Sequence, residues 1–491
     1  MSKLIDNLSN LTFTQNGAVA FSSTKDPIVD LFCAANTFSS IELGDVGLVS
    51  LFVLAWKYDR NLALRAMLQA YDCRKGGGRR DAFMVMMEAI ARLTKDGDGI
   101  SDSQFTQIAT RIYEYGRWDM YWKLIEYLDE QGVGNGVWTH TLFDLIATGL
   151  QTSESAPLVA KWLPRKGKMA NRIRGFLKLE PAAYRHMLSK YTTAETQMSA
   201  NQWDKIQYEH VPSKCGLRNA HAFAAHDNER YGAYIQAVKA GRAKMNTSTL
   251  YPYEIVNVFN LAYDDNDDRD VMDAAWTSFL ANANYDRSID ILPIVDVSGS
   301  MTRRVAGNTS AMDIAISLGL YISQTNHGQF AHEVVTFSET PQFVRIDETS
   351  CYEAVKHIRG LNWGFNTDLD LVFVTMLNRA KAAGITDAEM PKVIMIFSDM
   401  EFDSCAYMTG LEQIRNDYKK NGYTLPLVVF WNIGENHPFP TLASEPGVVM
   451  VSGFSPTIIQ PILECDFNKI NPTEMVRKIL MNDRYDIGLN L

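Results

Sequence analysis

The chain has 491 residues, enough for two large domains or three of ordinary size. Hydrophobic residues make up 46% of it and charged residues 21%, a globular composition that excludes a wholly disordered, collagen-like or coiled-coil protein. The 57 acidic residues outnumber the 47 basic ones, and the net charge is −10. Any binding to phosphate must therefore come from a local basic patch.

The cysteines and the apolar segments indicate a protein of the cell interior. The six cysteines include no C-x-x-C pair and no dense framework, a pattern typical of reduced cytosolic thiols. The first 15 residues lack the apolar stretch of a signal peptide. The longest apolar run, Val46–Trp56, has 11 residues and is too short to span a bilayer. We expect a soluble cytoplasmic protein without membrane contact.

The N-terminal half of the chain is predicted to be helical. Residues 1–44 lack periodicity and are expected to form an N-terminal arm. Across residues 45–285, apolar residues recur at spacings of three and four, as in Phe83, Met86 and Ile90, which predicts helices. Helices separated by short polar breaks favour a HEAT-like array in which stacked pairs bury a continuous core. No repeat of fixed period is visible in the sequence.

Residues 286–491 show a different pattern, in which short apolar runs alternate with helical stretches. The predicted strands are Ile291–Val295, Glu333–Phe337, Val393–Phe397, Leu427–Trp431 and Val448–Val451. The predicted helices are Ala311–Gln324, Leu369–Ala383, Gly410–Lys420 and Met475–Met481. Continuous apolar strands that alternate with helices indicate a mainly parallel sheet covered on both faces. The predicted fold class is α + α/β, a helical array followed by a doubly wound Rossmann-like domain.

Oxygen-bearing side chains follow the ends of these predicted strands. Asp296, Ser298 and Ser300 alternate on the loop after the first strand. Thr367 precedes a predicted helix, and Asp399 follows the third strand. Parallel sheets bind ligands at the carboxyl ends of their strands, and oxygen-only donors suit a hard cation. The five residues therefore predict a site for Mg²⁺ or another divalent cation; for D-x-S-x-S alone, a helix N-cap is the alternative.

The five residues match in type and order the metal-ion-dependent adhesion site of von Willebrand factor A domains, and the chain from residue 290 onward resembles that family. The resemblance implies that Ser298 and Ser300 contact the metal directly and that Thr367 does so in one conformation. It implies that Asp296 and Asp399 act largely through water. One coordination position is then left for a carboxylate or another oxygen of a protein partner.

A basic segment lies in the helical half, at residues 161–190. It has nine Lys and Arg against one Glu, a net charge of +8 that leaves −18 on the rest of the chain. Aromatic residues are interleaved with the cations, as in proteins that bind single strands. The candidate RNA contacts in this segment are Arg165, Lys166, Lys168, Arg172, Arg174 and Lys178. The alternative is a helix with a solvated basic face.

A second basic cluster, the glycine-rich loop of residues 74–80, combines four cations with three glycines. Its candidate RNA contacts are Arg74, Lys75, Arg79 and Arg80. A flexible basic loop would let the backbone approach a phosphate, and an ordinary exposed loop between helices is the alternative. The loop is not a P-loop, because no Gly-Lys-Ser/Thr follows it.

The helical half resembles the family called domain of unknown function 2828. The resemblance rests on the strings LPRKG at residues 163–167, YRHMLS at 184–189, MSANQW at 198–203, VPS at 211–213 and DNERY at 227–231. It extends from about residue 30 onward, and the family has a von Willebrand A region at its C-terminal end. The architecture is also similar to that of the Ro autoantigens, which combine a helical-repeat TROVE domain with a von Willebrand A domain. Ro proteins bind misfolded and small structured RNA, which by analogy implies RNA as a partner.

The sequence contains no catalytic motif. It has no nucleophile elbow, no H-E-x-x-H and no G-x-G-x-x-G followed by an acidic ribose binder, so we expect no enzymatic activity. The leading interpretation is a Ro-like RNA-binding scaffold with a metal-dependent ligand site. The alternatives are a metal-dependent adaptor between proteins and a component of a larger assembly without RNA binding.

Overall fold

The protein forms two compact units in a computed structural model. The structure describes residues 10–14, 16–37, 47–191, 193–257, 266–283, 286, 288–336, 341–361, 369–402, 407–434, 439–467 and 470–489. The sheet unit comprises Met1–Ser40 and Tyr208–Ile479, and the helical unit comprises Ile41–Gln207 and Leu480–Leu491. The chain therefore passes between the units three times.

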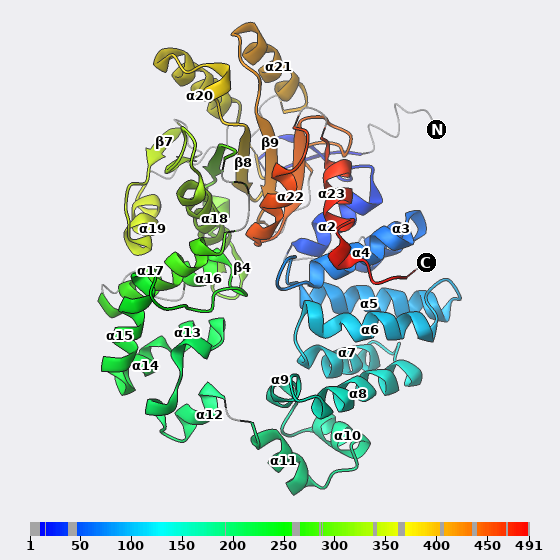
Figure 1. Ribbon diagram of the computed structural model, residues 1–491. Helices are drawn as coiled ribbons and strands as arrows, with labels where there is room; N and C mark the ends of the chain where they lie inside the picture. Colours follow the sequence, from blue (N-terminus) through cyan, green and yellow to red (C-terminus); the bar gives the residue numbers. More distant parts are fainter. Residues whose placement is uncertain are drawn as a thin grey trace. The chain divides into compact units, whose positions relative to one another are not determined.

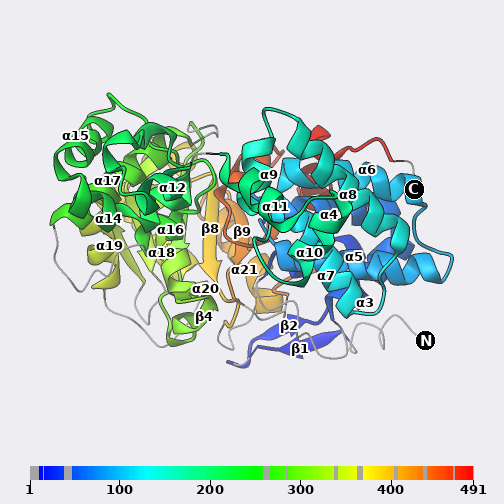
Figure 2. The ribbon, with the colours of Figure 1, turned by 90° about the horizontal axis from the view of Figure 1, so that it is seen from below.

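The helical unit is an array of short helices (Figures 1 and 2), as predicted. Its helices are α3 (Leu48–Tyr58), α4 (Arg60–Tyr71), α5 (Arg80–Lys95), α6 (Asp102–Tyr115), α7 (Asp119–Glu130), α8 (Gly136–Gln151), α9 (Ala156–Trp162), α10 (Lys168–Phe176), α11 (Pro181–Ser189) and α12 (Ala194–Ser199). Neighbours in the chain pack on one another, α3 against α4 and α5, and α8 against α6, α7 and α9.

Two local features explain why these segments form helices: the spacing of their apolar residues and the residues that cap their ends. Phe83, Met86 and Ile90 on α5 are fully buried, which confirms that their spacing marks a core-facing stripe. Ser101 accepts a hydrogen bond from the amide of Gln104, whose side chain bonds back to Ser101, so a capping box starts α6. The spacing and the caps together explain why the array was visible in the sequence.

The sheet unit contains a six-stranded sheet in the order β10-β9-β8-β3-β6-β7. Its strands are β3 (Ile291–Val295), β6 (Glu333–Thr336), β7 (Gln342–Arg345), β8 (Val393–Ser398), β9 (Leu427–Asn432) and β10 (Val448–Ser452). All neighbours are parallel except β6 and β7. Read from β7, the order is the 3-2-1-4-5-6 arrangement of doubly wound folds, with an antiparallel edge strand. The parallel strands were predicted; β7 was not, because its residues are half-buried or exposed and lack an apolar run.

Helices lie between the strands of this sheet along the chain, and two more follow its last strand (Figure 1). They are α18 (Ala311–Thr325), α19 (Cys351–Arg359), α20 (Leu369–Ala383), α21 (Tyr407–Lys420), α22 (Ile459–Leu463) and α23 (Pro472–Leu480). The helix α18 packs against β3, β6 and β8, and all but two of its residues are buried. No helix in the described parts of the chain is long and apolar enough to cross a membrane.

Five helices that precede the sheet in sequence also belong to the sheet unit. They are α13 (Ser213–Arg218), α14 (Ala220–His226), α15 (Asn228–Lys239), α16 (Pro252–Val256) and α17 (Asn266–Ala281). The helix α17 packs on α19, and the Asp273 carboxylate accepts a 2.8 Å hydrogen bond from the amide of Cys351. The compact units therefore divide at residues 207/208, whereas the sequence predicted a domain boundary at 285/286.

The described part of the predicted N-terminal arm is folded. The strands β1 (Leu11–Phe13) and β2 (Val19–Phe21) form an antiparallel hairpin (Figure 2), and α2 (Pro27–Asn36) follows. The helix α2 packs on β10, and Thr473 donates a 2.8 Å hydrogen bond to Asp26, the N-cap of α2. These residues complete the sheet unit.

The C-terminal residues 480–491 belong to the helical unit because they hold a buried carboxylate there. Asp72 has no exposed surface, and Arg484 donates to it with Nε and, at 2.8 Å, with Nη2. Tyr485 reaches the same carboxylate at 3.4 Å. The hydroxyl of Tyr115 donates a 2.6 Å bond to the carbonyl of Arg484. Through Tyr485, which is buried, this segment thus contributes to the core of the helical unit.

We predict that Arg484→Ala lowers the free energy of unfolding by about 3 kcal/mol, because it leaves the Asp72 charge buried without its cation. Urea unfolding followed by circular dichroism measures the effect. Arg477→Ala is the matched control, since Arg477 is exposed on α23, and it should change stability by less than about 0.5 kcal/mol. Equal stabilities of the two variants would contradict the assigned role of the C-terminal segment.

Candidate functional site

The sheet places the candidate cation site between β3 and β8. These strands are parallel neighbours, but the chain leaves β3 toward β6 and leaves β8 toward β9, on opposite sides. Their carboxyl ends therefore border the crevice in which open α/β sheets bind ligands. Asp296 and Asp399 are the residues that follow the two strands. The ladder continues to Asp296, whose amide donates a 3.0 Å bond to the carbonyl of Phe397.

Asp296 is held rigidly at the bottom of this site. It has no exposed surface, and its Oδ1 accepts a 2.9 Å bond from the amide of Ser298. Its Oδ2 accepts a 2.6 Å bond from the hydroxyl of Ser398. Burial, together with the negative charge of Asp399, raises the pKa of Asp296 to about 6. The predicted hydroxyl pair is assembled above it, since Oγ of Ser298 and Oγ of Ser300 lie 3.1 Å apart.

Asp399 completes the described part of the site. Its side chain bonds with Ser300, and its Oδ1 accepts a 3.2 Å bond from the amide of Glu401. Burial raises its pKa, and the hydrogen bonds and the charge of Arg303 oppose the rise. Gly434 lies directly against this residue, because a Cβ on Gly434 would be 2.5 Å from that of Asp399. A side chain at position 434 would push Asp399 away from the site.

The donor set fits a hard divalent cation. Two buried carboxylates and two hydroxyls share one loop cluster, and Ser300 is exposed, which leaves the cluster open to solvent. The fifth predicted ligand, Thr367, lies outside the described residues. Among the residues that the structure describes, no three His, Cys, Asp or Glu side chains are grouped as metal ligands. A cation here would therefore depend on the hydroxyls and on water, as in the predicted ligand set.

The N-terminal hairpin holds the loop after Asp399, which the sequence did not indicate. The Thr14 hydroxyl donates a 2.7 Å bond to the carbonyl of Phe402, and the Asn16 side chain donates a 2.7 Å bond to that of Glu401. Met400, which lies between β8 and these two residues, has a left-handed φ of 65°. This backbone conformation is unfavourable for a residue other than glycine. Contacts between residues almost 400 positions apart thus maintain the conformation of the loop.

We predict that Thr14→Val lowers the free energy of unfolding by about 2 kcal/mol. The change keeps the shape of the side chain but removes the buried hydroxyl that donates to the carbonyl of Phe402 and accepts from the amide of Ala18. Chemical denaturation measures the difference. Thr12→Val in β1 is the control, because Thr12 is half-buried on the same hairpin; it should be nearly neutral. A neutral effect of Thr14→Val would show that the hairpin does not support the loop.

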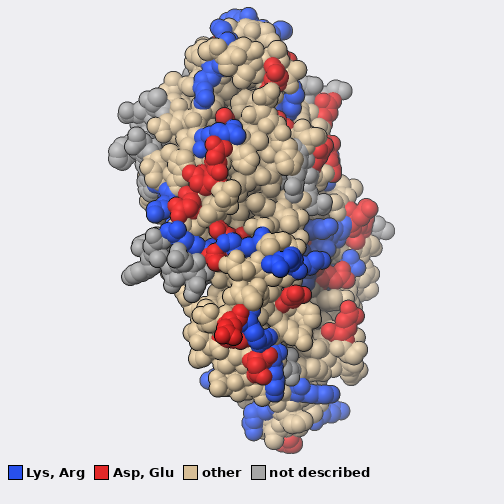
Figure 3. All heavy atoms as spheres, turned by 60° about the vertical axis from the view of Figure 1, so that its left-hand side comes forward, with Lys and Arg blue, Asp and Glu red and all other residues tan. Residues whose placement is uncertain are grey.

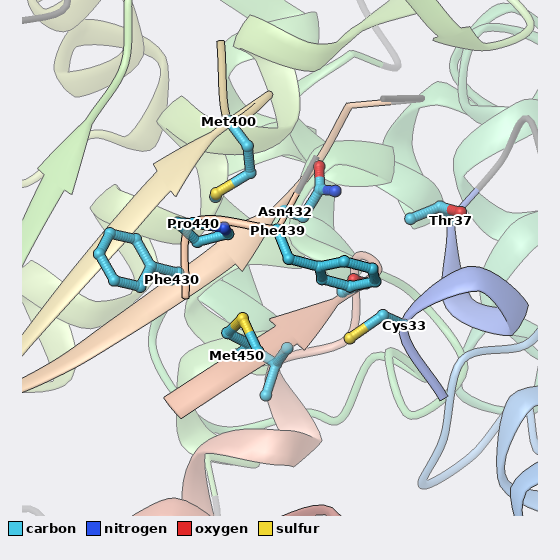
Figure 4. A pocket seen from close by; sticks show the side chains of 10 residues that line it. Cys33, Thr37, Met400, Phe430, Asn432, Phe439, Pro440 and Met450 are labelled. Carbon is cyan, nitrogen blue, oxygen red and sulfur yellow. The ribbon is translucent and has the colours of Figure 1, made fainter. Parts of the chain in front are cut away.

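A small cavity lies behind this loop (Figure 4). It is lined by Cys33, Thr37, Met400, Phe430, Asn432, Phe439, Pro440, Met450, Val451 and Ser452. Its volume of about 20 Å³ accommodates a single water molecule. Burial raises the pKa of Cys33 to about 12, so this thiol is an unreactive part of the core. The cavity is therefore too small to be a ligand site.

The predicted RNA contacts of the basic segment are only partly available. Arg165 and Lys166 are exposed in the loop before α10, Lys168 is exposed at its start, and Lys178 is exposed after its end. Figure 3 shows Lys and Arg side chains at the lower end of the view, the level at which Figure 1 draws α10 and α11. Two further candidates are engaged in the fold: Arg172 pairs with Asp129 at 2.7 Å, and Arg174 donates to the carbonyl of Leu179 at 3.2 Å.

In the glycine-rich loop, the structure removes one candidate. Arg74 and Lys75 are exposed, and Arg80 is half-buried. Arg79, however, is only 1% exposed and pairs with Asp81 at 2.6 Å, so its interpretation as an RNA contact is corrected. The physical reason is that the loop folds back on α4, where the amide of Arg79 donates a 2.7 Å bond to the carbonyl of Ala70. The loop is ordered by these bonds and does not present all four cations.

Two families described only as domains of unknown function match consecutive parts of the chain. DUF2828 matches residues 139–285 and DUF7788 matches residues 290–484. The first match confirms the predicted resemblance over a shorter stretch than expected. The second covers the sheet and the candidate cation site, and the von Willebrand A resemblance of this region stays a prediction.

Two further similarities extend over almost the whole chain. The uncharacterized protein L728 of Acanthamoeba polyphaga mimivirus is 27% identical over 523 aligned positions, which cover 96% of this chain and 88% of that protein. The crystal structure of the Ro (RSR) protein of Deinococcus radiodurans superposes with a TM-score of 0.52 at 15% identity, covering 93% of this chain and 99% of the other. The chain shares the Ro fold. The similarity concerns the backbone arrangement alone.

Proposed function

We propose that the protein is a non-enzymatic, Ro-like RNA-binding scaffold that contacts single-stranded or misfolded RNA through its basic segment. The observation that carries the proposal is the exposed group Arg165, Lys166 and Lys168, three cations within four residues and without an acidic residue among them. They belong to a stretch of net +8 in a chain of net −10, so the helical unit has a locally positive surface. The Ro-like fold supports this function by analogy of architecture.

We further propose that the sheet unit binds Mg²⁺ or another divalent cation through Asp296, Ser298, Ser300 and Asp399, with Thr367 as the fifth predicted ligand. Two buried carboxylates of like charge support this proposal, because a cation would compensate them. When bound, the cation would offer an open coordination position to a carboxylate of a protein partner. The five cysteines that the structure describes form no disulfide with one another, as expected for the reducing cytoplasm in which we place the protein.

The RNA proposal predicts a specific change in salt dependence. Replacing Arg165, Lys166 and Lys168 by Ala should weaken binding of single-stranded RNA and make the log–log salt slope shallower by about 2, because each phosphate contact on a single strand contributes about 0.7. Fluorescence anisotropy at several salt concentrations measures both quantities.

The matched control is a variant with Lys392, Lys419 and Lys420 replaced by Ala, which removes the same charge from exposed positions of the sheet unit. The control should bind RNA as the wild type does. Equal salt slopes for both variants would contradict the proposal and favour the alternative, an adaptor that binds a protein carboxylate through the cation.

The cation proposal predicts that Ser300→Ala weakens Mg²⁺ binding at least about tenfold, since it removes one oxygen donor from an exposed position that does not support the core. Isothermal titration calorimetry with MgCl₂ measures the affinity. Ser288→Ala is the control, because Ser288 is an exposed serine outside the site. Equal affinities of the wild type and Ser300→Ala would remove Ser300 from the ligand set.

A further inference from the structure

The helical unit contains an aromatic groove, most of whose lining residues are not among the RNA contacts predicted from the sequence. It lies between the end of α6, the start of α7, the end of α8 and the helix α9, and its volume is about 530 Å³. Its walls include Arg74, Tyr113, Arg117, Trp118, Leu158 and Trp162. Tyr113 is 42% exposed and Leu158 is 54% exposed, so large apolar side chains face solvent here. Ligand pockets for small organic groups have this size and lining.

The aromatic rings of the groove are held as flat surfaces. Tyr113 stacks on Trp118 with ring centroids 5.1 Å apart and an angle of 13° between the planes. Trp118 lies directly against α8, where a Cβ on Gly149 would be 2.6 Å from its ring, so glycine is needed for this approach. The guanidinium of Arg117 lies over Trp162, 4.0 Å from the ring centroid. Trp118 also stacks on Tyr121 and is only 8% exposed, so it supports the wall of the groove. Tyr113 and Trp162 are the planar side chains that we expect to stack with a planar ligand.

The charge next to these rings is positive. Asp119 is buried, and it is shared by three cations: Arg80 at 3.6 Å, Arg117 at 2.5 Å and Lys123 at 2.8 Å. One carboxylate cannot neutralise three cations, and Arg74 adds a fourth at the wall of the groove. Glu154 is the acidic residue among the residues that line the groove. The surplus of positive charge favours an anionic ligand.

We propose that this groove binds an unstacked nucleobase of single-stranded RNA, with the adjoining phosphates near Arg74 and Arg80. The proposal rests on the proposed RNA-binding function and names a site for it outside the predicted contacts. Trp162 ends α9 and stands three residues before Arg165, so a strand that crosses the exposed cations of residues 165–168 reaches the groove within a few nucleotides. Any base can stack on an aromatic ring, so a site of this kind binds RNA of different sequences.

The test separates stacking from charge. A fluorescent 12-nucleotide oligouridylate is compared with a 12-unit abasic ribose-phosphate chain, on wild type and on Trp162→Ala. We expect Trp162→Ala to weaken binding of the oligouridylate about tenfold and to leave its salt slope unchanged, because a stacked base contributes energy without a phosphate contact. The abasic chain should bind both proteins equally.

Two further variants keep the test independent of folding. Trp162→Phe preserves an aromatic face and should retain most of the affinity, and Trp203→Ala removes a tryptophan outside the groove and should bind as wild type does. Equal binding of the oligouridylate by wild type and Trp162→Ala, or an equal loss with the abasic chain, would overturn the groove proposal while leaving the basic segment in place. Absence of RNA binding by the wild type would overturn the proposed function itself.

Discussion

The candidate cation site depends on the point at which the parallel sheet reverses its winding. The chain leaves β3 and β8 toward opposite sides, and open α/β sheets bind ligands in the crevice that this reversal creates between the carboxyl ends of the two strands. The residues after these strands can then approach each other while their backbones stay in the hydrogen-bonded ladder. Two carboxylates are buried there at the cost of raised pKa values, and the hydroxyls of Ser298, Ser300 and Ser398 partly compensate that cost. A divalent cation would compensate the negative charge of the two carboxylates.

Both ends of the chain contribute to structure far from their place in the sequence. The N-terminal hairpin bonds to the carbonyls of Glu401 and Phe402 and so supports the loop that follows Asp399. The C-terminal segment supplies Arg484 to the buried carboxylate of Asp72 in the helical unit. Each end therefore supplies hydrogen-bond donors to buried acceptors, and truncation at either end should affect a unit to which the sequence alone does not assign it.

Basic residues in this protein serve two different purposes. Arg79 and Arg172 form ion pairs with neighbouring aspartates and stabilise the helical unit. Arg165, Lys166 and Lys168 are exposed in and beside a loop, where their charge is available to a partner. The aromatic groove adds flat apolar surfaces to the same unit. In the proposed function, the cations bind the phosphates of a single strand and the aromatic rings stack with its bases. Neither interaction depends on the base sequence.

Elements whose apolar residues recur with a regular period could be predicted from the sequence. The stripe of α5 and the apolar runs of β3, β8, β9 and β10 could be read directly, because a core-facing residue must recur with the period of its element. The placement of Asp296 and Asp399 at one sheet edge followed from the direction of parallel strands. Four features could be seen only in the folded chain: α17 packs on α19, residues 10–37 join the sheet unit, Arg79 is buried, and Tyr113, Trp118 and Trp162 line one groove. These features depend on contacts between distant segments, and local periodicity contains no information about which distant surfaces meet.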